Sequence, residues 1–146
     1  MERLTLAQAI HNAIEAEHAA ESFYAALAAR CENADTHSFF RAMAVREHLH
    51  AESVAAFFTV PDGGVASWAD LPVDGVETLP VWEDRPDLSL AEALELAKRC
   101  ERHAADYYAR MSAATDGPVA SFFLEMQAYE EDHVCEIDRI RGVLGV

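Results

Sequence analysis

Hydrophobic residues recur along this chain at helical spacing in four separate stretches. Apolar positions three or four residues apart line one side of a helix, so each stretch predicts an amphipathic helix that faces a core. The predicted helices span about residues 5–31, 36–58, 89–114 and 118–141. Between the second and third helices, proline and glycine recur too often for a long helix to form.

Two of the predicted helices begin at a capping box. Thr5 is followed three residues later by Gln8, and Ser89 is followed at the same distance by Glu92. In this arrangement each side chain bonds the backbone of the other residue, which satisfies donors that the helix start leaves free. The pairs therefore predict where the first and third helices start.

Two further helix ends are marked by single residues. Asp35 or Thr36 is the expected N-cap of the second helix, because short polar side chains accept bonds from the first free backbone amides. Gly142 is expected to close the fourth helix.

The 146 residues fit one domain, residues 1–146, with one sizeable core. Short connections near residues 33 and 116 would make two helical hairpins, and residues 59–88 would form a crossover that runs back along them. We expect the apolar crossover residues to pack on the outer side of the bundle, and a short strand or helical turn to fit within this segment. The fold class is therefore all-α, a ferritin-like four-helix bundle of two hairpins joined by a long crossover.

The two predicted hairpins repeat each other. Four residues of the first helix, Ala13-Glu17-Ala20-Tyr24, match four of the third, Ala97-Glu101-Ala104-Tyr108. Three residues of the second helix, Met43-Glu47-His50, match three of the fourth, Met126-Glu130-His133. A repeat of this kind indicates a duplicated helical hairpin.

Acidic side chains interrupt the apolar stripes at corresponding places. One glutamate lies on each of the first and third helices, and a Glu-x-x-His pair lies on each of the other two, the positions being Glu17, Glu47, His50, Glu101, Glu130 and His133. Residues equidistant from a hairpin turn lie level with each other, so each hairpin would bring two carboxylates and one imidazole together. Buried carboxylates are costly unless they are protonated or balanced, and two divalent ions would balance four of them. This pattern predicts a dinuclear metal site; protonated or solvated acids are the alternative.

Charge and cysteine content narrow the function classes. The net charge of −15 argues against binding to nucleic acid or to an anionic membrane surface. The N-terminal residues lack the pattern of a secretory signal, and no apolar run is long enough to cross a bilayer, so we expect a cytoplasmic protein. The three cysteines are scattered and form no C-x-x-C pair, which excludes a disulfide scaffold and a rubredoxin-type iron site; we expect them to be buried.

These motifs resemble the ferritin-like di-iron carboxylate superfamily, and most closely its small rubrerythrin-like members. The resemblance covers residues 5–142 apart from the crossover. It implies that the six acidic and histidine residues above bind two iron ions, with Glu47 and Glu130 as bridging ligands, although manganese or zinc could also occupy the site. Tyr24 and Tyr108 resemble the tyrosines that lie behind the ligands in this family; plain core aromatics are the alternative.

The chain departs from its relatives in several places. Rubrerythrins proper carry an additional Glu where this chain has Ala104, and they commonly carry a rubredoxin domain that is missing here, so electrons would come from another protein. The six-residue set is closer to that of bacterioferritin, whose haem-binding Met corresponds to His48, although we expect His48 to be an exposed residue. The other histidines are also expected on the surface, with an auxiliary metal role as the alternative for His18 and His103.

The resemblance implies a rubrerythrin-like oxidoreductase that reduces H2O2 or O2. An iron-handling ferroxidase and a non-catalytic metal-binding module are the alternatives. The resemblance also implies a homodimer. The sequence leaves open the native metal, the oxidant, the electron donor, any exchange of helices between protomers and the role of the crossover.

Overall fold

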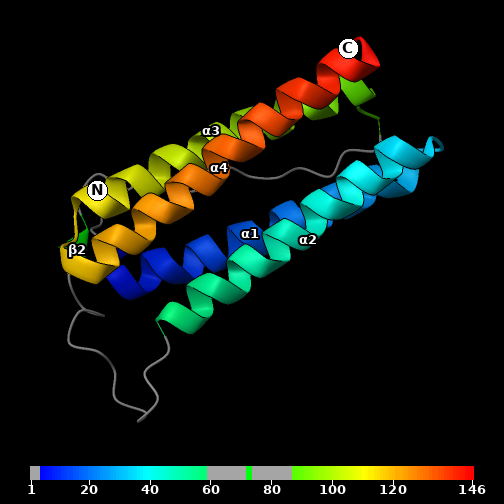
Figure 1. The fold of residues 1–146 in the computed structure, drawn as a ribbon. Coiled ribbons are helices and arrows are strands. Elements are labelled where there is room, and N and C mark those ends of the chain that lie inside the picture. The colour runs from blue at the N-terminus through cyan, green and yellow to red at the C-terminus, as the bar shows by residue number, and fades with distance from the viewer. Residues whose placement is uncertain (1–3, 59–71, 74–86) are drawn as a thin grey trace.

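A computed structural model describes residues 4–58, 72–73 and 87–146 of the chain (Figure 1). Its four long helices are α1 (Leu6–Arg30), α2 (Ala34–Phe57), α3 (Leu90–Ala113) and α4 (Gly117–Leu144). The two-residue strands β1 (Leu4–Thr5) and β2 (Pro72–Val73) pair antiparallel. The all-α four-helix fold is as predicted, and β2 is a short strand within the crossover. The predicted packing of the apolar crossover residues lies outside the described residues.

The helices form two antiparallel hairpins, α1 with α2 and α3 with α4. Figure 1 shows them side by side, with the turn of the first hairpin at the end where α3 begins and α4 ends. The two turns therefore lie at opposite ends of the bundle. The end of α2 and the start of α3 therefore also lie at opposite ends, as in four-helix bundles with one long crossover. In the described ranges, no helix is long and apolar enough to span a membrane.

Helix ends follow the sequence signals in part. Both predicted capping boxes are present, at Thr5 and at Ser89. The N-cap of α2 is Asn33, not Asp35 or Thr36, because its side chain accepts bonds from the backbone amides of both those residues. The prediction for the end of α4 was also wrong.

Gly142 lies inside α4, which continues to Leu144. The residue that follows the helix is Gly145, whose φ of 70° lies in the left-handed region that glycine adopts without steric cost. A glycine does not end a helix by itself. The helix α4 ends at Gly145 because the backbone takes a left-handed conformation there.

Two apolar clusters fill the bundle, one toward each end. The first surrounds Phe40 and Leu94, and the second surrounds Leu6 and Phe123. The apolar spacing of the second predicted helix also places Phe57 on its core face, but Phe57 is 40% exposed and stacks on the Phe122 ring at 4.3 Å. Cys100 is buried as expected, whereas Cys31 is half-buried and Cys135 is exposed. The buried polar residues of α1 to α4 lie mostly between these clusters.

Candidate metal centre

Six buried polar side chains from all four helices meet inside the bundle. The helices α1 and α3 each contribute one glutamate, and α2 and α4 each contribute a glutamate and a histidine, the residues being Glu17, Glu47, His50, Glu101, Glu130 and His133. None of the six is more than 8% exposed. In the group from α2 and α4, each residue offers a ligand atom within 4.8 Å of the others. The structure therefore brings all six predicted ligands together.

The imidazole of His133 marks one half of this cluster. Its Nδ1 atom lies 2.7 Å from Oε1 of Glu47, 3.4 Å from Oε1 of Glu101 and 3.5 Å from Oε2 of Glu130. One nitrogen and three carboxylates thus face a common point. Such a set of hard oxygen donors with one imidazole suits a divalent iron, manganese or zinc ion.

The imidazole of His50 marks the other half. Its Nδ1 atom lies 3.7 Å from Oε2 of Glu17, 3.7 Å from Oε2 of Glu47 and 3.6 Å from Oε1 of Glu130. The His50 and His133 rings are stacked, with centroids 5.0 Å apart and planes at 14°. The two halves of the cluster are therefore adjacent.

Glu47 and Glu130 belong to both halves. Each approaches both imidazoles, whereas Glu17 approaches His50 and Glu101 approaches His133. Two central carboxylates with one outer carboxylate and one imidazole on each side form the arrangement that two bridged metal ions need. Glu47 and Glu130 thus take the central places, from which they could contact both of two bound ions.

Several polar atoms of the cluster are buried without a hydrogen-bond partner. They are Oε1 of Glu47, Oε2 of Glu101, Oε1 of Glu130 and Nδ1 of both His50 and His133. The short approach between His133 and Glu47 does not change this, because the two atoms are close but do not have the directions of a hydrogen bond. Unpaired buried polar atoms lower the stability of a fold, and bound cations would satisfy these atoms. The residues present therefore fit a pair of metal ions.

Two tyrosines hold the outer carboxylates across the hairpins. Tyr24 of α1 donates a hydrogen bond of 2.6 Å to Oε1 of Glu101 on α3, and Tyr108 of α3 donates one of 2.6 Å to Oε1 of Glu17 on α1. Burial and the neighbouring carboxylates raise the pKa of both phenols well above the usual value, so both stay protonated donors. Each tyrosine therefore lies directly behind a predicted ligand.

Burial strongly disfavours charge on the two central carboxylates. It raises the pKa of Glu47 and of Glu130 well above the usual value, and the negative charges of Glu17 and Glu101 raise both further. Burial and these charges therefore favour the protonated, uncharged form of both central side chains in the metal-free protein.

The outer carboxylates and the imidazoles behave in the opposite way. Burial alone would raise the pKa of Glu17, but the nearby side chains of Glu47, His50 and Glu130 lower it to about 2. The pKa of Glu101 is likewise lowered, against burial, by the neighbouring Glu130 and His133 and by the hydrogen bond from Tyr24. Burial would lower the pKa of His50, but the surrounding carboxylates raise it to about 11, and the pKa of His133 is raised for the same reasons. In the metal-free protein, these shifts favour protons on the central carboxylates and on the imidazoles, which offset the charges of the outer carboxylates.

A surface pocket of about 410 Å³ reaches the imidazoles between α2 and α4. Its lining consists of Arg46, His50, Tyr129, Asp132, His133, Cys135 and Glu136. The Tyr129 ring lies 5.1 Å from that of His50. The sequence analysis assigned no role to Tyr129. Its position next to the predicted ligand Glu130 could have indicated that it lies close to the candidate metal centre.

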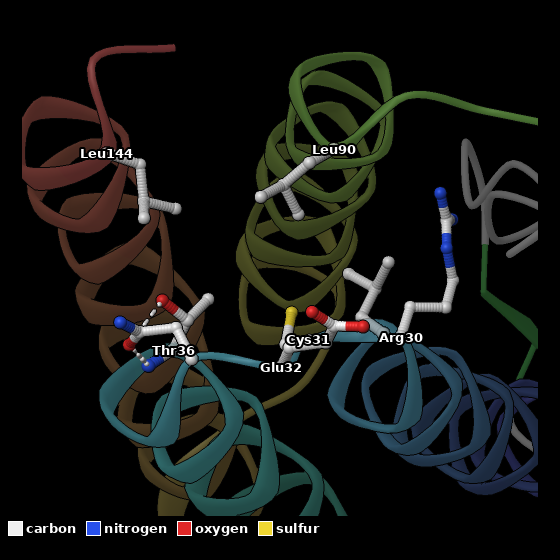
Figure 2. A pocket seen from close by; sticks show the side chains of 8 residues that line it. Arg30, Cys31, Glu32, Thr36, Leu90 and Leu144 are labelled. Atoms are coloured by element: carbon white, nitrogen blue, oxygen red, sulfur yellow. Dashed lines mark hydrogen bonds between the residues drawn. The ribbon is translucent and has the colours of Figure 1, made fainter.

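A second pocket, of about 370 Å³, lies at the end of the bundle near the α1–α2 turn (Figure 2). The Cys31 sulfur and the side chains of Leu90 and Leu144 lie around it in Figure 2. Burial raises the pKa of Cys31 although Arg30 opposes it, so this thiol is not activated as a nucleophile. The pocket contains none of the six predicted ligands and lies apart from the candidate metal centre.

The fold is similar to that of a solved structure from Thermotoga maritima, a candidate ferritin-like diiron-carboxylate protein. The two chains superpose with a TM-score of 0.79 over 97% of each chain, at 20% sequence identity. Identity at this level shows a shared fold. Comparison with curated proteins gives no match.

The sequence also matches a family model. The matched region is residues 8–141, which includes all four helices apart from their outermost residues and all six side chains of the candidate metal centre. The model is that of Rubrerythrin. This chain therefore belongs to the rubrerythrin family.

Proposed function

We propose that the protein is a dinuclear iron oxidoreductase that reduces H2O2 or O2. The observation that carries this proposal is the sharing of Glu47 and Glu130 between the two imidazoles, with one outer carboxylate beside each ring. The family and the fold support a dinuclear carboxylate centre. The donor set suits iron, and manganese or zinc would also be accepted.

Each residue has a distinct task in this proposal. Glu47 and Glu130 hold the two ions together, while Glu17 with His50 and Glu101 with His133 hold one ion each. Two bound Fe(II) ions would supply the two electrons that, with two protons, reduce one H2O2 to two water molecules.

The protein's own groups orient the site and control access to it. The Tyr24 and Tyr108 hydroxyls each donate to one oxygen of an outer carboxylate, Oε1 of Glu101 and Oε1 of Glu17, and so orient these two side chains. The pocket beside His50 and Tyr129 is the route by which a small oxidant would approach. The apolar clusters on both sides of the site limit the entry of bulk water.

Reduction needs an external source of electrons. The three cysteines of this sequence form no C-x-x-C pair and so provide no rubredoxin-type iron site. A partner electron-transfer protein of the cytoplasm would therefore reduce the centre after each turnover. We further propose that the protein acts as a homodimer, which light scattering of the purified protein tests.

A ferroxidase is the second candidate, and one observation favours it. Ala104 stands where rubrerythrins proper carry an additional Glu, so the centre has four carboxylates. A centre with one carboxylate fewer than that of rubrerythrins proper would bind oxidised iron less tightly, which suits a protein that releases iron after oxidation.

The two functions are separated by their preferred oxidant. Metal-free protein is loaded anaerobically with two equivalents of Fe(II), then mixed in a stopped-flow instrument with H2O2 or with O2. Much faster oxidation by H2O2, with iron retained at the centre and re-reduced by an added donor, supports the oxidoreductase. Faster oxidation by O2, with release of iron and uptake of more, supports the ferroxidase. Failure to react with either oxidant would contradict both and leave a metal-binding module.

A further inference from the structure

A second group of ligand-type side chains lies on the outer face of the first hairpin. It consists of His18 and Glu21 on α1 and His48 on α2, and each residue offers a ligand atom within 4.8 Å of the others. The side chains of His18, Glu21 and His48 are 52%, 32% and 46% exposed, whereas the neighbouring Glu17 and Glu47 are buried. This outer group is therefore separate from the candidate metal centre.

We propose that His18, Glu21 and His48 form a mononuclear binding site for a divalent transition-metal ion, with Zn²⁺ as the preferred ligand. The Nδ1 atoms of both histidines lie 3.2 Å from the Glu21 carboxylate, one from each of two helices. Two imidazole nitrogens and one carboxylate oxygen form a three-residue donor set that leaves a position for water. Imidazole ligands favour zinc over magnesium or calcium, which prefer oxygen.

The ring of His48 is already oriented for this role. Its Nε2 atom lies 3.2 Å from Oε1 of Glu52, one turn further along α2. In the metal-free structure Nδ1 of His48 is hydrogen-bonded to Glu21; when a cation replaces that proton, Glu52 would hold the remaining proton on Nε2 and leave Nδ1 as the ligand atom. Histidines that bind metals commonly have such a carboxylate behind them.

The surroundings leave room for the remaining ligands. A surface pocket of about 340 Å³ borders Glu21 and His48, with Arg41 also in its lining. The imidazole rings of His18 and His48 stand 6.1 Å apart at 56°, so they are not stacked on each other. Water molecules can therefore complete the coordination of an ion held between the rings.

The second hairpin has no equivalent of this group. Glu17 corresponds to Glu101 and Glu47 to Glu130, so the counterparts of His18, Glu21 and His48 are Arg102, Ala105 and Glu131. An arginine and an alanine cannot bind a cation in place of His18 and Glu21. The outer site thus occurs once per chain and does not belong to the duplicated ligand set.

Equilibrium dialysis of the full-length protein against Zn²⁺, with metal counted by mass spectrometry, tests the proposal. Wild-type protein is expected to bind one more equivalent than the His18→Ala/His48→Ala variant. The matched control is His11→Ala, which removes an exposed α1 histidine that pairs with Glu15 at 3.4 Å, and it is expected to bind as much zinc as wild type. Equal binding by wild type and the double variant would overturn the proposal.

A second variant tests the orientation by Glu52. Glu52→Ala removes no proposed ligand but leaves His48 without its carboxylate, so zinc affinity at the outer site should fall by roughly 10- to 100-fold. Unchanged affinity would overturn the role of Glu52. The result is independent of the proposed oxidoreductase activity, which is tested by the reaction of the iron-loaded protein with H2O2 and with O2.

Discussion

The phenol of Tyr24 on α1 lies 2.6 Å from Oε1 of Glu101 on α3, so the first hairpin holds a carboxylate of the second. Tyr108 and Glu17 make the reciprocal bond at the same distance. Each hairpin thereby supplies an outer carboxylate and also the group that orients the outer carboxylate of the other. The two halves of the duplicated sequence are joined at the candidate metal centre itself.

Replacing Tyr24 by phenylalanine should destabilise the metal-free protein. Glu101 would stay buried and lose a hydrogen bond to a charged group, which costs about 1.5–3 kcal/mol in the free energy of unfolding. Urea denaturation measures this change. The matched control is Tyr107→Phe, since Tyr107 is also buried but donates to the backbone oxygen of Ala9.

The two variants should also differ in metal affinity. Tyr24→Phe is expected to weaken metal binding, because Glu101 loses the bond that orients it, whereas Tyr107→Phe should leave the affinity unchanged. Equal affinities for all three proteins would show that Tyr24 is only a core aromatic residue.

Metal loading should release protons. Glu47 and Glu130 have pKa values well above the usual one, and the pKa of His50 is about 11 with that of His133 also raised, so all four hold a proton at pH 7 in the metal-free chain. Ligands bind metal in the deprotonated form, so filling the centre should release about four protons.

The sign of the pH dependence follows from this release. Protons compete with metal, so affinity should weaken as pH falls below 7 and strengthen as pH rises. Calorimetry of Fe(II) or Zn²⁺ binding in buffers of different ionisation enthalpy counts the protons. Binding without proton release would show that the buried cluster is not where the metal binds.

The N-cap of α2 gives a prediction about stability alone. Asn33→Ala removes the side-chain oxygen that accepts from the amides of Asp35 and Thr36, which should cost about 1 kcal/mol in the free energy of unfolding. Ser38→Ala, an exposed position on the same helix, is the control and should change stability by less than about 0.5 kcal/mol. Thermal denaturation of both variants measures the difference. A smaller effect for Asn33→Ala than for the control would contradict this cap.

Sequence pattern was sufficient for the helices and for the convergence of the six buried side chains. Apolar spacing determines which helix face is buried, and equal distances from a hairpin turn determine which residues lie level, so the meeting of Glu17 with Glu47 and His50 could be derived. Which carboxylate oxygen faces which imidazole depends on side-chain rotamers, which spacing alone does not determine.

Other features of the structure could not be predicted, because they depend on contacts that the local sequence pattern does not determine. The choice of Asn33 over Asp35 as N-cap depends on a shift of two residues in the helix start, a boundary that varies easily. The outer group of His18, Glu21 and His48 joins two helices through exposed side chains, and an apolar stripe contains no information about them. The pocket beside Tyr129 likewise results from the way α2 and α4 pack.

The central claim is that Glu47 and Glu130 hold two metal ions between the hairpins. Anaerobic titration with Fe(II), followed by desalting and iron analysis, tests it most directly in wild type and in the Glu47→Gln/Glu130→Gln variant. Glutamine has the shape of the protonated acid, so circular dichroism should show that the variant still folds. We predict that wild type retains two more irons per chain than this variant. Equal iron content in the two proteins would contradict the account.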